Sequence, residues 1–324
     1  MPSPVLPAAA WRERAEAHAA RADALTADHR ARRAAGETHA VEDFLHTYYP
    51  TRPGQLRRWH PGAGVVLDGT GPDVDERRGW RWYTGEGTRT WVDAQAFLTE
   101  RGSTVAFVRE LLARTAARPA QLGCFGLHEW AMVYRDGDSP RHPLPLRLGA
   151  VGTDEVVEAL PLRCSHIDAF RFFTPDAVPL NELRPTRATQ VDLEQPGCLH
   201  ANMDLYKWAL KLGPAVASEL VLDCFELALD VRRLDMRASP YDVSGYGLEA
   251  VAVETPAGRA EYVRHQRAFA EQAADLRARL VEACDAVLAH GETSVGEVPA
   301  DRAPADQVPV DHVPAVRRPV PEPS

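Results

Sequence analysis

The sequence predicts a mainly α-helical protein with a small β component, and three observations lead to this prediction. Several segments of helical length contain no proline and repeat their apolar residues at helical spacing. Tryptophan and tyrosine gather between residues 80 and 91, which indicates a few short strands. After Gly291, prolines recur every five residues in a context that offers little to bury. We therefore expect a single principal domain and a disordered Pro-rich C-terminal tail.

Three parts of the chain follow from these signals. Residues 8–35 contain neither glycine nor proline, and Gly36 is a typical signal for the end of a helix. Residues 1–36 are therefore expected to hold one N-terminal helix. The principal, mainly helical domain is expected to cover residues 37–290, and the tail residues 291–324.

The first half of the principal domain alternates between regular and irregular segments. Apolar residues within 41–48 share one helical face, and the prolines and glycines that follow, up to Gly64, force an irregular path. Residues 68–103 are a polar excursion with short strands. Residues 105–117 are expected to return to helix.

The second half is expected to be a series of helices. The apolar residues of 123–134 cover most of a helix circumference, which is typical of a buried helix. Residues 144–148 and 160–164 have the pattern of two short strands around a helix begun by Thr153. Three longer helices are expected at residues 199–212, 215–235 and 259–289.

The bulk properties favour a cytoplasmic protein. No stretch approaches the roughly 18 consecutive apolar residues of a membrane span, so no membrane association is expected. The five cysteines are scattered without a CxxC pair, and we expect them to be reduced. The formal charge of −9 argues against a broad, non-specific attraction to nucleic acid. Local arginine patches could still contact DNA, and no obligate protein partner is inferred.

A group of possible metal ligands and catalytic side chains lies in the second half. His166 and Asp168 form an HxD pair at the end of an expected strand, where alternate side chains point to the same side. This pair can supply two ligands of a metal site, with His200, Glu194 or His128 as a third. It can equally supply a general base and the carboxylate that orients it.

The helix expected at 199–212 adds to this group. His200 and Asp204 are four residues apart and share a helical face, and Glu194 lies just upstream of a turn at Pro196 and Gly197. We therefore expect the polar residues of this region to converge in one cavity. They are His166, Asp168, Glu194, His200 and Asp204.

The segment before them contains Cys124 and His128, also four residues apart. Cys-x3-His can bind zinc, but no second pair with a structural-zinc spacing exists in the chain. The alternative is a core histidine with satisfied hydrogen bonds beside a small buried thiol.

Several charged stretches permit two interpretations each. The acidic stripe of Glu219, Asp223, Glu226 and Asp230 is either a solvated helix face or the lining of a polar cavity. The arginines of residues 8–35 either contact phosphates or are solvated. The aromatic and basic loop Arg57, Arg58 and Trp59 can grip an anion or stack on a base, or its aromatic residues pin the loop to the domain. Arg237 either neutralises a helix dipole or binds a phosphate.

Five long motifs give the chain a family resemblance. They are HAVEDFLHTYYPTRPGQLRRWHPGAGV, CFGLHEWAMVY, RCSHIDAFRFFTP, EQPGCLHANMDLYKWALKL and LDMRASPYD, within residues 10–285. In these motifs the chain resembles a family of actinobacterial proteins commonly labelled 3-methyladenine DNA glycosylase. The Gly-rich hairpin of helix-hairpin-helix glycosylases is absent, and the corresponding LGCFG at 122–126 has no proline.

The resemblance implies a hydrolase of DNA repair, an N-glycosylase that excises alkylated purine bases without a cofactor. Excision needs an aromatic pocket for the extruded base and a carboxylate that stabilises the oxocarbenium-like sugar. The catalytic candidates are then Asp168, Asp204, Glu194 and Arg171. The substrate-binding candidates are Arg57, Arg58, Trp59, Trp130, Tyr206 and Arg237.

Two other functions remain open from the residues themselves. The first is a metal-dependent oxygenase or hydrolase that acts on a small molecule. Its metal would be iron, zinc or manganese, and its ligands would come from His166, Asp168, His200 and His128. The second is a non-enzymatic binding protein.

Overall fold

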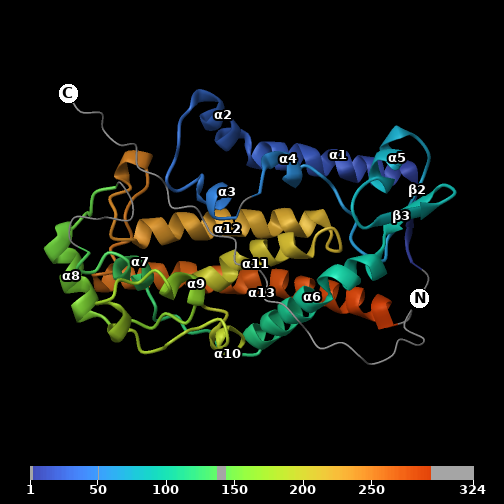
Figure 1. The fold of residues 1–324 in the computed structure, drawn as a ribbon. Coiled ribbons are helices and arrows are strands. Elements are labelled where there is room, and N and C mark those ends of the chain that lie inside the picture. Colours follow the sequence, from blue (N-terminus) through green and yellow to red (C-terminus); the bar gives the residue numbers. More distant parts are fainter. Residues whose placement is uncertain (1–2, 50, 137–143, 293–324) are drawn as a thin grey trace, which may run out of the picture. The chain divides into compact units, whose positions relative to one another are not determined.

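A computed structural model describes residues 3–49, 51–136 and 144–292 of the chain, with side chains up to residue 289 (Figure 1). The mainly α class with a small β component is confirmed. Apart from residues 291 and 292, which end the last helix, the predicted C-terminal tail lies outside the described residues. Among the described helices, none combines the length and the apolar character that crossing a membrane requires.

The predicted N-terminal helix is two helices, α1 (Ala8–Leu25) and α2 (Ala27–Ala35). The break is at Thr26, whose φ of −108° and ψ of 4° are not helical. Its hydroxyl donates a hydrogen bond to the Ala22 carbonyl at 2.8 Å, a local bond that competes with the helical ladder. The end at Gly36 is as expected, since Gly36 has the left-handed φ of 72° that favours glycine.

The β component is one four-stranded sheet with the strand order β1-β2-β4-β3. Strands β3 (Tyr83–Glu86) and β4 (Arg89–Val92) form an antiparallel hairpin, and β2 (Val66–Asp68) pairs antiparallel with β4 and parallel with β1 (Val5–Leu6). The short strands predicted around Tyr83 and Trp91 are thus confirmed. Helix α5 (Pro72–Arg78) packs beside the hairpin.

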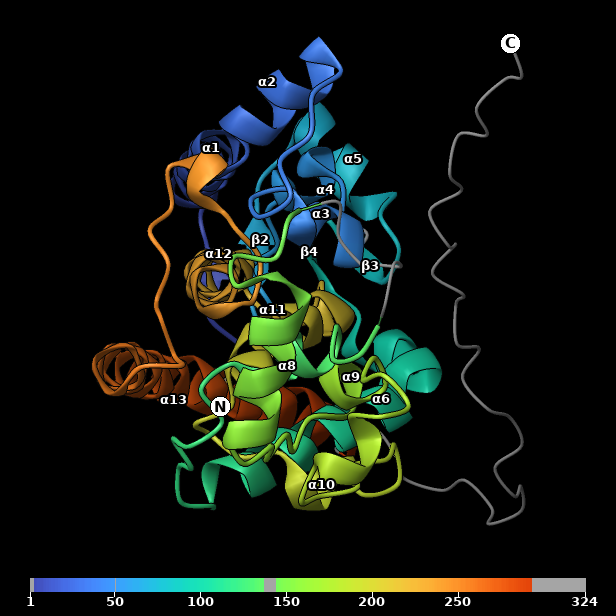
Figure 2. The ribbon, with the colours of Figure 1, turned by 90° about the vertical axis from the view of Figure 1, so that its left-hand side faces the viewer.

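Four long helices form the centre of the fold, namely α6 (Ala94–Ala116), α11 (Leu199–Leu212), α12 (Ser218–Ala238) and α13 (Pro256–Glu292). Helices α11, α12 and α13 pack against one another, and α6 lies along α13. Figure 2 shows α1, α12 and α13 almost end-on, so these three helices run in similar directions. Helix α6 starts eleven residues before its predicted start at 105, because Asp93 caps it by accepting a 2.9 Å hydrogen bond from the Ala96 amide.

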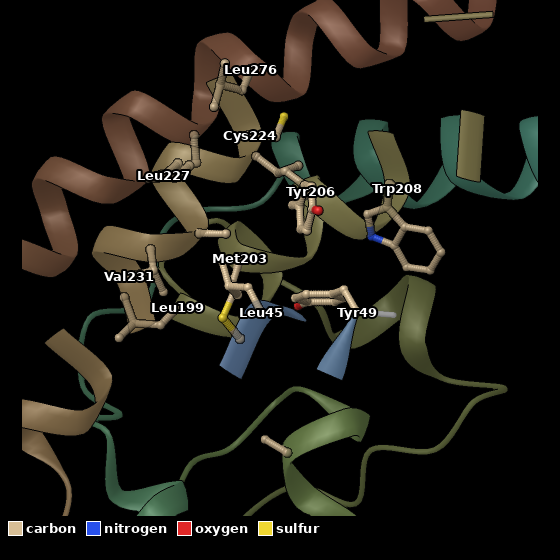
Figure 3. Close-up of a cluster of buried hydrophobic side chains, with 14 of the residues drawn as sticks. Leu45, Tyr49, Leu199, Met203, Tyr206, Trp208, Cys224, Leu227, Val231 and Leu276 are labelled. Atoms are coloured by element: carbon tan, nitrogen blue, oxygen red, sulfur yellow. The ribbon is translucent and has the colours of Figure 1, made fainter. Parts of the chain in front are cut away.

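The core between these helices is aromatic and aliphatic (Figure 3). Tyr206, Met203 and Leu199 of α11 are fully buried, and they meet Leu227 and Val231 of α12. Burial of a side chain of this size stabilises the fold by about 1.5–3 kcal/mol. The helical period predicted for 199–212 therefore reflects a real core face, and the bounds of α11 match the prediction.

Shorter elements complete the domain around this centre. They are α3 (Phe44–Tyr48), α4 (Pro53–Leu56), α7 (Leu127–Ala131), α8 (Gly149–Ala159), α9 (Ile167–Phe170), η1 (Val178–Leu180), α10 (Gln190–Leu193) and η2 (Ser244–Tyr246).

The helix predicted for 123–134 is correct only in part. The segment from Leu127 to Tyr134 is buried as expected, but α7 has only five residues. Phe125, Gly126 and Arg135 have φ values of 45°, 71° and 50°, and left-handed residues cannot continue a right-handed helix.

The two strands predicted at 144–148 and 160–164 are wrong. Each segment makes only an isolated bridge, Leu146 with Tyr241 and Leu162 with Asn181. Since their partners lie in irregular segments, no ladder extends from either bridge. Helix α8 lies between the two segments, but it begins at Gly149 and not at Thr153.

The two interpretations of the acidic stripe of α12 each hold only in part. Glu226 and Asp230 line a polar pocket of about 430 Å³ together with Arg32, Glu42 and Arg233. The first three residues of the stripe face α1, where Arg14 pairs with Glu219 at 2.8 Å and Arg21 bridges Asp223, at 2.8 Å, and Glu226. Two of the arginines predicted to be solvated or to contact phosphates are therefore engaged within the domain. These ion pairs hold the first helix along α12.

Candidate metal centre

Three buried side chains from three separate elements converge at one end of the helical core. His128 belongs to α7, His200 to the first turn of α11, and Asp235 to the last turn of α12. One ligand atom from each lies within 4.8 Å of the other two, and all three residues are buried. Among the described residues, this is the only such group of three His, Cys, Asp or Glu side chains.

The contacts inside this triad differ from those of an ordinary ion pair. His128 Nε2 lies 3.0 Å from Asp235 Oδ1, yet neither atom makes a hydrogen bond of good geometry. The rings of His128 and His200 meet edge to face, with centroids 4.4 Å apart. Buried polar atoms without partners are costly. A bound ion would satisfy both atoms.

The electrostatic environment shifts the pKa of each member of the triad in its own way. Burial and the neighbouring His128 lower the pKa of His200 to about 3, so this imidazole is neutral near pH 7. Burial opposes the ionisation of Asp235, but the charge of His128 outweighs it, and the pKa of Asp235 is lowered. Burial also lowers the pKa of His128, but the charge of Asp235 reverses the effect, and the net shift is upward. A neutral imidazole and a carboxylate are the forms that bind metals, and His200 and Asp235 have these forms. A metal ion that binds His128 would have to displace any proton from the nitrogen that it uses.

Arg232 contacts the triad through the carboxylate of Asp235. Its Nη1 lies 3.2 Å from Asp235 Oδ2 and 3.4 Å from Glu129 Oε1, and its guanidinium group lies 3.9 Å from the centre of the Phe44 ring. Because Arg232 binds the outer oxygen of Asp235, the inner oxygen is left facing the two histidines. Outer contacts of this kind orient the ligands of metal sites.

A small cavity of about 20 Å³ borders the triad and is lined by His128 and His200. This volume holds about one water molecule. Three thiols, Cys124, Cys164 and Cys198, also line it. Burial raises the pKa of each thiol, to about 12 for Cys164, so all three are protonated near pH 7. The cavity supplies room for one more ligand beside the histidines.

A second polar cluster adjoins the triad through His166. The ring centroids of His166 and His200 are 5.5 Å apart, and His166 Nε2 lies 3.3 Å from Glu194 Oε1 and 3.5 Å from Asp204 Oδ2. Burial lowers the pKa of His166, but Glu194 and Asp204 raise it to about 10 in all. His166 is therefore an imidazolium between two carboxylates. Gln190 completes the cluster by donating a 2.6 Å hydrogen bond to Glu194.

The cluster continues to the surface through Lys207. Its ammonium group lies 2.8 Å from Asp204 Oδ2 and 2.9 Å from Asp168 Oδ2, and Arg187 binds Asp168 through both terminal nitrogens. Burial opposes ionisation of Asp168, but Lys207 and Arg187 lower its pKa to about 2. Tyr49 donates a further hydrogen bond to Asp204. Both carboxylates are thus held ionised.

The structure brings together the five residues expected to converge, but in two groups. His200 lies in the triad with His128. The adjacent cluster contains His166, Glu194 and Asp204, and Asp168 lies at its outer end, where it contacts Lys207. The strand geometry inferred for the HxD pair is wrong. His166 is the N-terminal cap of α9 and Asp168 lies in its first turn. The carboxylate beside the two histidines is Asp235, and Asp168 binds basic side chains.

Asp235 was missed in the choice of ligands, although the sequence holds a signal for it. It follows Cys224, Ala228 and Val231 at helical spacing on the apolar face of α12, away from the acidic stripe. A single carboxylate on an apolar face must have a buried partner. Its partner, however, lies 107 residues earlier in the chain.

The other candidates make separate contacts. Arg57 pairs with Asp23 at 2.9 Å, Arg58 lies 4.8 Å from the Trp80 ring centre, and Arg237 contacts Glu261 at 3.2 Å. Arg171 lies nearer the cluster, 3.4 Å from Asp168.

The aromatic candidates are buried. Trp59 donates a hydrogen bond to Glu219 at 2.9 Å, and Trp130 donates one to the Ala238 carbonyl at 2.9 Å. Tyr206 belongs to the core shown in Figure 3.

A scan of protein-family models, a search of curated proteins and a search of solved structures each found no match to this chain.

Proposed function

We propose that this protein is a metal-dependent enzyme that binds one divalent transition-metal ion through His128, His200 and Asp235. One observation carries the proposal, namely the convergence of three buried ligand atoms within 4.8 Å. Two of these atoms, His128 Nε2 and Asp235 Oδ1, lie 3.0 Å apart as an ion pair whose geometry is poor for a hydrogen bond. The substrate is a small molecule, and the reaction is an oxygenation or a hydrolysis.

The donor set supports this proposal. Two histidines and one carboxylate bind catalytic Fe(II) in oxygenases, and three protein ligands with an open fourth position are usual for catalytic zinc. Bound metal would activate dioxygen if it is iron, or lower the pKa of a water if it is zinc. The cavity beside His128 and His200 has room for that one small ligand.

The residues around the triad have supporting roles in this proposal. Arg232 orients Asp235 through its outer oxygen. His166, an imidazolium next to His200, holds a proton close to the ion without competing for it. The cavity has room for one small ligand only, so a larger substrate would bind only if residues that line it moved.

Metal content tests the proposal. Protein purified without added chelator and analysed by plasma mass spectrometry should contain about one iron, zinc or manganese ion per chain. His128→Ala, His200→Ala and Asp235→Ala should each lose that ion while circular dichroism shows a retained helical fold. His265→Ala is the control, since His265 is half exposed on α13.

Two results would overturn the proposal. Protein that takes up none of the three metals, even after incubation with each, has no such site. Variants of the triad that keep the same metal content as His265→Ala would place the ion elsewhere.

The second candidate is a DNA N-glycosylase for alkylated purines, as the resemblance implies. The observation that favours it is that Asp168 and Asp204 are both held ionised, as a carboxylate that stabilises an oxocarbenium-like sugar must be. An excision assay on alkylated duplex DNA at low salt tests it. Release of alkylated base by metal-free protein, lost in Asp204→Asn, would support this candidate over the metalloenzyme.

A further inference from the structure

The only two lysines of the chain, Lys207 and Lys211, lie on one face of α11. Counted from His200, the polar residues of this face are four, seven and eleven positions along the helix, at Asp204, Lys207 and Lys211. A helix rises 1.5 Å per residue, so Lys207 lies about 10 Å and Lys211 about 16 Å along the axis from His200. The stripe leads from the buried triad to the exposed end of α11.

Basic side chains from other elements gather at this end. Arg187 and Arg171 both contact Asp168, and Lys207 is shared between Asp168 and Asp204. Arg171 and Arg187 keep about a third and a half of their side-chain surface in solvent. The Asp168 carboxylate thus contacts three basic side chains, and two of them, Arg171 and Arg187, are partly exposed to solvent.

Two further cations near this group have no acidic partner among the described residues. Lys211 is exposed and Arg101 is half-buried on α6, which packs against α11. Burial and the positive charges of Lys207, Arg101 and Arg187 lower the pKa of Lys211. Lys211 therefore lies close enough to Lys207, Arg101 and Arg187 for their charges to repel one another.

Three basic side chains pair with two carboxylates, and Arg101 and Lys211 lie near them, which gives an excess of three positive charges on a chain whose formal charge is −9. His166 and Glu194, which lie next to the group, cancel each other. A ligand that carries two or three negative charges would balance the excess, whereas a monocarboxylate would not.

We propose that Arg101, Arg171, Arg187, Lys207 and Lys211 form a binding site for the phosphate groups of a small phosphorylated molecule. The charge excess fits a diphosphate. Arginine forks and lysine ammonium groups are the side chains that bind phosphate oxygens most strongly. The site shares no residue with the metal triad, so the inference does not depend on the proposed function.

The test uses inorganic pyrophosphate and inorganic phosphate as probes, measured by isothermal titration calorimetry on the full chain at low salt. Pyrophosphate should bind one per chain and more tightly than phosphate. Lys211→Gln and Arg101→Gln should each weaken pyrophosphate binding about fivefold or more, as expected for a lost charge-assisted contact. Arg109→Gln is the control, because Arg109 lies on the same helix α6 and pairs with Asp285.

Each contrary result overturns the proposal. Protein treated with a chelator should bind pyrophosphate as untreated protein does, and loss of binding would place the phosphate on a metal ion. Absence of pyrophosphate binding, or equal weakening by Arg109→Gln and Lys211→Gln, would show that no such site exists. Binding of a short single-stranded DNA, but not of pyrophosphate, would assign the basic group to nucleic acid.

Discussion

The hydroxyl of Tyr49 donates a hydrogen bond of 2.6 Å to Asp204 Oδ1, across 155 residues of sequence. Tyr49 is the C-terminal cap of α3, and its ring also packs edge to face on Tyr206. Asp204 is buried, so its charge needs every donor that reaches it. Those donors are Tyr49 and Lys207, and His166 Nε2 lies 3.5 Å from Asp204 Oδ2. The hydrogen bond thus ties the N-terminal part of the chain to the polar cluster of α11.

Tyr49→Phe should lower the free energy of unfolding by about 1.5–3 kcal/mol, because it removes a hydrogen bond to a buried charge. Urea unfolding followed by circular dichroism measures this loss. The control is Tyr48→Phe, since the neighbouring Tyr48 is only half-buried and its hydroxyl makes no hydrogen bond to any residue that the structure describes. Equal stabilities of the two variants would mean that Asp204 does not depend on Tyr49.

Asp168 should make stability depend on pH in the acid range. Lys207 and Arg187 hold its pKa at about 2, below the ordinary value of 3.8 for an aspartate, despite burial. A carboxyl with a depressed folded-state pKa stabilises the fold above pH 3.8, and this contribution is lost as the pH falls toward 2. The shift corresponds to about 2 kcal/mol.

Unfolding free energies measured at several pH values between 2 and 5 check this expectation. The curve of Asp168→Asn should be flatter over this window than that of the unmodified protein. Asp275→Asn, at an exposed position of α13, should leave the slope unchanged. A slope in Asp168→Asn as steep as in the unmodified protein would contradict the expected role of Asp168.

Added metal should raise the melting temperature if the triad binds an ion only in the folded state. The stabilisation follows RT ln(1 + [metal]/Kd) and reaches about 2.7 kcal/mol at a metal concentration 100 times Kd. Asp235→Asn should abolish the increase, while Asp230→Asn, on the outer face of the same helix, should keep it. Scanning calorimetry of chelator-treated protein with added Zn²⁺ or Mn²⁺ measures the increase in melting temperature. An increase that persists in Asp235→Asn would refute the assignment of Asp235 as a metal ligand.

Arg21 should contribute modestly to the stability of the fold, and its contribution should decrease as the salt concentration rises. It bridges Asp223 and Glu226, so Arg21→Gln removes two partly exposed ion pairs between α1 and α12. We expect a loss of about 0.5–1 kcal/mol at low salt and less at 0.5 M salt, because screening weakens such pairs. Arg33→Gln, at an exposed position of α2, should have no effect. Urea unfolding at both salt concentrations tests the difference.

Much of the helical framework could be predicted because its signals are local. The bounds of α11 follow from its apolar period, the turn at Gly197 and the end near Gly213, all within twenty residues of sequence. The convergence of His200, Asp204 and Lys207 on one face follows from the same period. The left-handed Gly36 likewise ends α2 without any help from the rest of the fold.

The tertiary structure decided which of these polar side chains meet, because contacts between distant segments leave no local pattern. Asp235 reaches His128 only because α7 lies against the C-terminal end of α12. From the sequence, the single carboxylate on the apolar face of α12 indicates a buried charge, but it does not indicate which residue is its partner. The acidic stripe of α12 has the same sequence pattern as a solvated face, yet Arg14 and Arg21 of α1 pair with three of its four residues. Periodicity predicts which face of a helix is polar, and only packing determines what that face contacts.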